Sequence, residues 1–250
     1  MSAPGRPEPQ KIVILKTGEP VPTVRERRGE FHDLIALAIG PAWQGAYGVV
    51  DARTDEPLPA PGAPNGPAAF VITGSAASVP DRLPWMLRTE AWLREVVAAG
   101  TPTFGICFGH QILAQALGGE VQRNPRGREM GTMEIERVSA DPLFAGLADR
   151  FQANVTHVDS VVRLPPGAEP LARSALESHQ ALRFAERCYG VQFHPEIDGD
   201  AMRGYLDARR PILTTEGFDV DAMIERAVDT PDGTRILRNF ARSFVRLRRG

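Results

Sequence analysis

The stretch GICFGHQ, residues 105–111, decides how the chain folds around it. A short apolar run at 103–106 precedes it, and a run with helical spacing at 111–117 follows it and ends at a glycine pair. This order predicts a strand, a sharp turn and a helix, with the thiol of Cys107 at the turn. The flanking glycines permit the tight backbone that such a turn requires. Because a helix N-terminus carries partial positive charge, this position favours a thiolate, the nucleophilic form of cysteine.

A second stretch, YGVQFHPE at residues 189–196, predicts a short strand that ends in His194 and Glu196. An imidazole can accept a thiol proton and return it to a leaving amine, and a carboxylate on its other nitrogen fixes its tautomer. Cys107 and His194 lie far apart in the sequence, so only tertiary structure can bring them together. One cysteine with a distant histidine and carboxylate predicts a Cys-His-Glu triad.

Length and composition limit the kinds of protein this can be. The 250 residues suffice for one domain with a substantial core, and 42% hydrophobic with 24% charged residues is ordinary for a globular protein. The net charge of −2 gives no electrostatic reason to expect nucleic acid as a partner. Two cysteines make no disulfide framework, which favours a reducing, cytoplasmic location. No apolar run is long enough to span a membrane. Residues 1–10 lack the apolar segment of a signal peptide, and we expect them to be disordered.

Strands and helices alternate through the first half of the chain. Helical spacing predicts helices at residues 31–38 and 85–99, and apolar runs predict strands at residues 11–16, 47–50, 69–73 and 103–106. This alternation predicts a parallel sheet with helices on both faces. Sites in such sheets form at the carboxyl ends of strands, where Gly74, Ser75 and Cys107 fall.

The rest of the chain predicts a different arrangement. Partly antiparallel pairing is expected for short strand candidates at residues 131–138, 150–156, 171–174, 181–185 and 190–193. Helices are predicted at 200–209, 220–228 and from about 233 to 248, the last with a continuous apolar stripe. The predicted fold is α/β, with three layers: a mostly parallel central sheet, helices on both of its faces, and a small antiparallel sheet in addition.

With both motifs in place, the chain resembles the class I glutamine amidotransferases, a family of Cys-His-Glu glutaminases. The family's Gly-x-Cys-x-Gly-x-Gln motif matches residues 105–111, and its His-Pro-Glu motif matches residues 194–196. The likeness covers roughly residues 11–197 and is greatest to stand-alone relatives of the amidotransferase domain of GMP synthase. It implies a flavodoxin-like amidotransferase domain over residues 11–210, with residues 211–250 as a helical extension packed on the same domain.

The resemblance implies a role for each matched residue. Cys107 attacks the side-chain amide of glutamine and forms a γ-glutamyl thioester, His194 is the general base and then the general acid, and Glu196 orients His194. The oxyanion donors would be the backbone of Phe108 and of Gly74 or Ser75. The residues implied to bind the substrate are Gln111, Thr156, His157, Val158 and Asp159.

Two positions depart from the family's pattern. The turn that is often written with two glycines and a proline is Gly74-Ser75-Ala76 here. A backbone donor tolerates the serine, but a positive φ at Ser75 would carry strain. Val158 stands where glycine is frequent, which leaves the shape of the glutamine pocket open. Cys188 and His110 are interpreted as structural. No close Cys/His pair has zinc spacing, so no metal or cofactor is expected.

These features predict a glutaminase that releases glutamate and ammonia from L-glutamine. The sequence has no Gly-rich phosphate loop, so a separate synthetase subunit that accepts ammonia and a self-sufficient hydrolase both stay open. One alternative is a γ-glutamyl peptidase or hydrolase for larger γ-glutamyl compounds, with a pocket widened by Val158 and the loop at 52–67. The other alternative is a non-catalytic regulatory subunit. The oligomeric state, a homodimer included, is left open.

Overall fold

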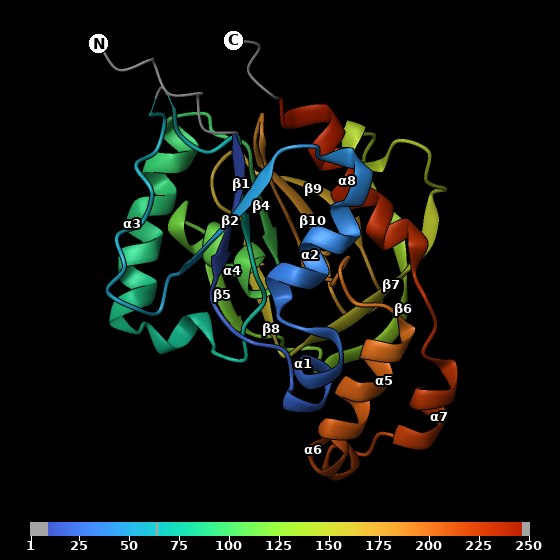
Figure 1. The fold of residues 1–250 in the computed structure, drawn as a ribbon. Helices are drawn as coiled ribbons and strands as arrows, with labels where there is room; N and C mark the ends of the chain where they lie inside the picture. The colour runs from blue at the N-terminus through green and yellow to red at the C-terminus, as the bar shows by residue number, and fades with distance from the viewer. Residues whose placement is uncertain (1–9, 64, 247–250) are drawn as a thin grey trace, which may run out of the picture.

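The computed structural model describes residues 10–63 and 65–246. The expected disorder of residues 1–10 therefore falls almost wholly outside the described residues. A nine-stranded sheet with the order β2-β1-β3-β4-β11-β10-β9-β6-β7 forms the centre of the fold (Figure 1). Its parallel half contains β2 (Ala46–Asp51), β1 (Lys11–Lys16), β3 (Ala69–Ile72), β4 (Thr103–Ile106) and β11 (Cys188–Val191). This is the flavodoxin-like strand order, which confirms the predicted fold class.

The antiparallel strands continue the same sheet, so the sheet is mixed. They are β10 (Ala181–Ala185), β9 (Glu169–Arg173), β6 (Glu129–Arg137) and β7 (Arg150–His157). The small antiparallel sheet is instead formed by β5 (Glu120–Arg123) and β8 (Asp159–Arg163). Only residues 186 and 187 connect β10 to β11, and so short a connection suits antiparallel neighbours.

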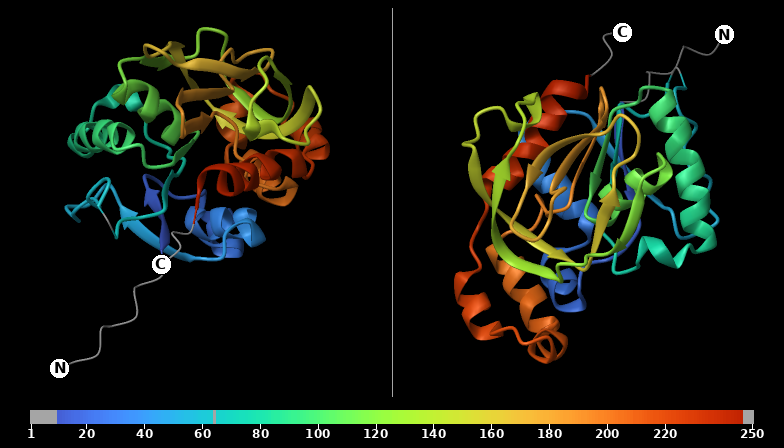
Figure 2. Two further views of the ribbon diagram at one scale, coloured as in Figure 1. Left: turned by 90° about the horizontal axis from the view of Figure 1, so that it is seen from above. Right: turned by 180° about the vertical axis from the view of Figure 1, so that it is seen from behind.

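Helices cover both faces of the sheet, and side chains of β1 alternate between them. Ile12 and Ile14 face one hydrophobic cluster, whereas Val13 and Leu15 face the other. The first cluster lies under α2 (Phe31–Ile39) and α8 (Pro231–Phe244), and the second under α3 (Pro84–Ala98) and α4 (Phe108–Ala116) (Figure 2). The three-layer arrangement follows from this alternation.

Four further helices gather at the end of the sheet where β1 terminates (Figure 1). They are α1 (Pro22–Arg28), α5 (Gly199–Ala208), α6 (Arg210–Thr215) and α7 (Val220–Arg226). Helices α1 and α6 were not predicted from the sequence. A proline occupies the first turn of each, where its missing N–H is not needed. Short 3₁₀ turns occur at Gly40–Ala42, Val79–Asp81 and Pro142–Phe144.

The last helix packs on the sheet by its apolar stripe. Phe240 is fully buried, with its ring centroid 5.0 Å from that of Phe104 on β4 and 6.4 Å from that of Tyr189 on β11. The helix ends at Phe244, earlier than predicted, and part of the predicted end lies outside the described residues. The division of the chain at residue 210 stays a prediction. None of the helices in the described part of the chain is both long and apolar enough to cross a membrane.

Candidate active site

Cys107 lies in the turn between β4 and α4, as the sequence predicts. Its backbone has a φ of 51° and a ψ of −102°, a conformation that is strained for a residue with a side chain. Its N–H donates to the carbonyl of Val191 at 2.8 Å, which ties the turn to β11. A Cβ on Gly105 would lie 2.4 Å from the carbonyl oxygen of Gly109, so only glycine allows this close packing of strand and helix. The turn thus holds the thiol in a fixed place.

His194 and Glu196 follow β11, the strand beside β4. His194 Nδ1 lies 2.8 Å from Glu196 Oε1, and both side chains are buried. The His194 N–H donates to the carbonyl of Asn154 at 2.8 Å, and its ring stacks on Phe31 with centroids 6.2 Å apart. The other ring nitrogen, Nε2, is buried and has no hydrogen-bond partner among the described residues. The imidazole is therefore fixed on one side and free on the other.

Gly74 lies close to both Cys107 and the imidazole of His194. A Cβ on Gly74 would lie 2.9 Å from His194 Cε1 and 3.8 Å from Cys107 Cβ. The structure therefore brings the cysteine and the histidine together at the carboxyl ends of β3, β4 and β11, as expected from the motifs. The parallel pairing of β11 with β4 is what makes this possible.

The charges of the two side chains stabilise one another. Burial raises the pKa of the Cys107 thiol, but the charge and hydrogen bond of His194, together with the charge of His157, hold this pKa below its ordinary value. Burial opposes the charge of His194 as well, yet Glu196 and the thiolate raise its pKa to about 10. Both shifts favour a thiolate–imidazolium pair, which is the reactive state of a cysteine nucleophile.

Two nearby candidates have the surroundings of structural residues. Cys188 is buried without a charged partner, and burial raises the pKa of its thiol. His110 is fully buried against Phe184, and burial lowers the pKa of its ring to about 3, so it is neutral at physiological pH. These surroundings agree with their interpretation as core residues. Among the residues that the structure describes, no three His, Cys, Asp or Glu side chains are grouped to hold a metal ion.

The turn after β3 is braced by the turn after β1. Thr17 Oγ1 donates to the carbonyl of Thr73 at 2.9 Å, and the Thr17 N–H donates to Thr73 Oγ1 at 3.0 Å. Ser75 does not have a positive φ, so the strain considered there is absent; it falls on Cys107 instead. Phe108 is the first residue of α4, where backbone N–H groups have no acceptor within the helix. The assignment of Gly74, Ser75 and Phe108 as oxyanion donors stays a prediction.

The segment from Thr156 to Asp159 lies beside the thiol. The carbonyl of Thr156 is 3.9 Å from Cys107 Sγ. Gln111 Nε2 donates to the carbonyl of Asp159 at 2.9 Å and to Gln192 Oε1 at 3.0 Å. The two N–H groups of Gln111 are thus used by this segment and by Gln192, and the predicted contact of Gln111 with substrate would involve other atoms. The role of the segment in substrate binding stays a prediction.

A second buried His–Glu pair, which the sequence did not reveal, supports this segment. His157 lies 3.0 Å from Glu129 Oε2 through Nε2 and 3.0 Å from the carbonyl of Asp159 through Nδ1. Because both neighbours are acceptors, the ring satisfies them best with both nitrogens protonated. Burial opposes this charge, but the bond to Glu129 raises the pKa of His157. Glu129 also accepts hydrogen bonds from Ser174 and Gln180.

A cavity of about 210 Å³ opens over the thiol. Cys107, His194, Ser75 and Thr156 line it, whereas the other predicted substrate-binding residues lie outside its lining. The remaining lining residues come from the loop after β1, from α1, α2, the turn after β3 and the α5 region: Glu19, Pro20, Val21, Pro22, Phe31, Ala76, Tyr205 and Arg209. Apart from Ala76, the sequence did not reveal these residues, because they belong to no motif.

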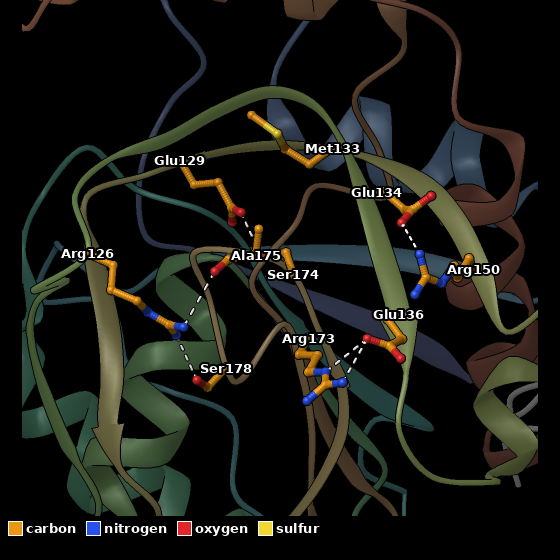
Figure 3. Close-up of a pocket in the computed structure, with 10 residues that line it drawn as sticks. All are labelled: Arg126, Glu129, Met133, Glu134, Glu136, Arg150, Arg173, Ser174, Ala175 and Ser178. Carbon is orange, nitrogen blue, oxygen red and sulfur yellow. Dashed lines mark hydrogen bonds and ion pairs between the residues drawn. The ribbon is translucent and has the colours of Figure 1, made fainter.

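A larger hollow of about 500 Å³ lies over β6 and β9 (Figure 3). Its charged side chains bind one another: Arg150 donates to Glu134 at 2.9 Å, and Arg173 donates to Glu136 at 3.0 Å. Arg126 donates to Ser178 Oγ at 2.7 Å. The arginines of this hollow are therefore already engaged, and the cavity over Cys107 is the better candidate for a substrate site.

The comparison with protein families agrees with this geometry. The family model named Glutamine amidotransferase class-I matches residues 54–206, a range that contains Cys107, His194 and Glu196. The chain belongs to the class I glutamine amidotransferase family.

This amidotransferase is similar to several known proteins. The glutamine-hydrolysing GMP synthase of Thermomicrobium roseum is 41% identical over 131 residues, which is 52% of this chain but only 24% of that protein. One subunit of the glutamine-hydrolysing GMP synthase of Pyrococcus abyssi is 41% identical over 97 residues, 38% of this chain and 51% of that protein. A solved glutamine amidotransferase from Methylobacillus flagellatus superposes with a TM-score of 0.77 at 23% identity, covering 96% of this chain and 97% of the other. That likeness concerns the fold alone.

Proposed function

We propose that this amidotransferase hydrolyses the side-chain amide of L-glutamine to glutamate and ammonia. One observation carries the proposal: a buried cysteine with a lowered pKa lies next to an imidazole whose far nitrogen is held 2.8 Å from a carboxylate. The order of these three groups is that of a nucleophile, a general base and a carboxylate that orients the base. Cys107, His194 and Glu196 fill the three roles.

The proposed reaction proceeds through an acyl-enzyme. The thiolate of Cys107 attacks the amide carbon, and the negative oxygen is stabilised by the N–H of Phe108 and by the backbone of Gly74 or Ser75. The imidazolium of His194 gives its proton to the leaving nitrogen, the C–N bond breaks, and ammonia leaves a γ-glutamyl thioester. His194 then removes a proton from water, the hydroxide attacks the thioester, and the C–S bond breaks to release glutamate. Glu196 keeps the ring oriented throughout.

The ammonia would pass to a separate synthetase subunit or to solvent. The similarity to one subunit of a GMP synthase supports a two-component arrangement. We expect the protein to act in the cytoplasm, where its thiol stays reduced.

A substitution of the nucleophile tests the proposal. Purified wild-type protein should release glutamate and ammonia in equal amounts, and Cys107→Ser should reduce turnover on the order of 10³-fold or more, because a hydroxyl is a far weaker nucleophile than a thiolate. Cys188→Ser, at the other buried cysteine, is the matched control and should keep wild-type activity. Equal turnover by wild type and Cys107→Ser would end the catalytic assignment.

A labelling experiment separates this proposal from a non-catalytic role. A glutamine analogue with an electrophilic carbon in place of the amide should add its mass to Cys107, as seen by peptide mass spectrometry. Wild-type protein that resists this label and has no turnover would favour the regulatory alternative.

The second candidate is hydrolysis of larger γ-glutamyl amides. It is favoured by the lining of the cavity, which extends beyond the motif residues to the loop at Glu19–Pro22 and to α5. A panel of γ-glutamyl peptides assayed beside L-glutamine distinguishes the two, and a strict preference for glutamine excludes the second.

A further inference from the structure

The cavity over Cys107 contains a cation that the reaction above does not use. Arg209, at the C-terminal end of α5, lines this cavity and is partly buried. Its guanidinium donates to Thr156 Oγ1 and lies 5.4 Å from the centroid of the Tyr205 ring. Neither of these partners carries a carboxylate.

Two nearby arginines, Arg210 and Arg128, have carboxylate partners, and Arg209 has none among the described residues. Arg210 Nη1 lies 2.9 Å from Asp221, and Arg128 Nε lies 2.6 Å from Glu216. For Arg209, the charges that act on its pKa come from Tyr205, Cys107 and Arg128, and burial lowers that pKa. A partly buried guanidinium without a carboxylate partner is unfavourable in the free protein, which indicates a binding role rather than a stabilising one.

The acidic residue of the same cavity is not available to balance this charge. Glu19 lies 3.1 Å from Lys16 Nζ, 2.5 Å from Arg25 Nη1 and 3.1 Å from Arg53 Nη2. Its charge is therefore already neutralised by three cations. The side of the cavity at Arg209 stays electropositive and suits an anion.

Thr156 connects this cation to the nucleophile. Its hydroxyl accepts the hydrogen bond from Arg209, and its carbonyl is 3.9 Å from Cys107 Sγ. A molecule acylated on the thiol would thus extend past Thr156 to reach the guanidinium. Arginine has five N–H donors in a planar fork, so one bond to Thr156 leaves donors for a carboxylate.

We propose that Arg209 determines specificity by binding a carboxylate of the γ-glutamyl substrate. This inference rests on the proposed function and names the group that the cavity recognises. Two carboxylates have the required chemistry: the α-carboxylate of the glutamyl unit, and the terminal carboxylate of a peptide leaving group. Arg209 acts on binding and leaves the chemical step to Cys107.

Two pairs of substrates test the proposal and show which of the two carboxylates Arg209 binds. The first pair is L-glutamine and L-glutamine α-amide, which differ only at the α-carboxylate. The second pair is γ-glutamylglycine and γ-glutamylglycinamide, which differ only in the leaving group. The variants are Arg209→Gln and Arg209→Lys, with Arg210→Gln as the matched control, since Arg210 is ion-paired outside the cavity.

Wild type should prefer the carboxylate over the amide by about 10²-fold in kcat/KM in one of the two pairs, because the amide leaves the guanidinium unpaired. Arg209→Gln should remove this preference by raising KM for the carboxylate substrate. Its kcat, and kcat/KM for the amide substrate, should change less than threefold. Arg209→Lys should keep part of the preference, and Arg210→Gln all of it. A preference in the first pair identifies the α-carboxylate, and one in the second pair identifies the leaving group.

The proposal is overturned if Arg209→Gln weakens carboxylate and amide substrates equally or changes neither. Alkylation of Cys107 by iodoacetamide, a neutral reagent, checks that the variant keeps its thiol intact. If wild type hydrolyses none of the four substrates, the proposed function fails, and calorimetry still tests this inference. Cys107→Ala should then bind L-glutamine more tightly than its α-amide or γ-glutamylglycine more tightly than its glycinamide, and equal affinities within both pairs would refute it.

Discussion

Gly74→Ala should displace the imidazole of the proposed triad without unfolding the protein. The added Cβ would lie 2.9 Å from His194 Cε1, about half an ångström short of ordinary contact, which begins at 3.4 Å. The ring cannot retreat freely, because Nδ1 is held 2.8 Å from Glu196 and the ring stacks on Phe31. The turn cannot retreat freely either, because Thr17 is hydrogen-bonded to the carbonyl of Gly74.

A displacement of this size affects the alignment of the reacting groups. Misplacement of a catalytic group by 1 Å can reduce a rate on the order of 10²-fold. For a shift of about half that distance, we expect kcat to fall about 10- to 100-fold, equivalent to about 1.4–2.7 kcal/mol in the activation free energy. The assay is steady-state glutaminase kinetics together with thermal unfolding of the same samples.

Gly48→Ala is the matched control, since a Cβ there would lie 3.5 Å from Val13 Cγ2, an ordinary contact. Neither glycine has a positive φ, so both substitutions change the conformational freedom of the unfolded chain alike. The control should keep wild-type kcat. A folded Gly74→Ala protein with kcat within threefold of wild type would refute the reasoning, because it would show that this contact does not set the position of His194.

Two further predictions concern pH and stability. The pH profile of kcat/KM should rise through the lowered pKa of Cys107 and fall as His194, with a pKa of about 10, loses its proton. Since Glu196 raises the pKa of His194, Glu196→Gln should move the alkaline limb to lower pH, and an unmoved limb would contradict the assigned pair. Phe240→Ala removes a fully buried ring and should lower the free energy of unfolding by about 3–5 kcal/mol in denaturant titrations. Leu37→Ala, at a side chain that is 71% exposed, should change the free energy of unfolding by less than about 0.5 kcal/mol. Equal effects of the two substitutions would contradict the packing of the last helix against the core.

Several features of the fold could be predicted because their signals are local. The strand, turn and helix around Cys107 are visible as an apolar run, a pair of glycines and helical spacing, all within residues 103–117. The apolar stripe of α8 likewise predicts a buried helix face, and Phe240 is indeed fully buried. Each of these patterns depends on neighbours in the sequence, since helical and strand periodicities are properties of short segments.

Other features could not be predicted because they depend on contacts between distant segments. Glu129 shows no motif, yet the pairing of β6 with β7 brings its carboxylate to His157. Arg209 is one of several arginines in its region, and only the packing of α5 beside the cavity distinguishes it. The backbone strain was considered at Ser75 from the family pattern, whereas the structure has it at Cys107.

The amino-acid sequence by itself determined the chemical groups: a thiol at a helix start, a histidine two residues before a glutamate, and the apolar runs that make the sheet. The tertiary structure alone decided how close these groups lie in space, because β11 lies parallel to β4 and brings His194 to the edge of the sheet where Cys107 lies. Side-chain chemistry is a property of each residue, whereas proximity arises from strand order and long-range packing, which a linear pattern does not encode locally.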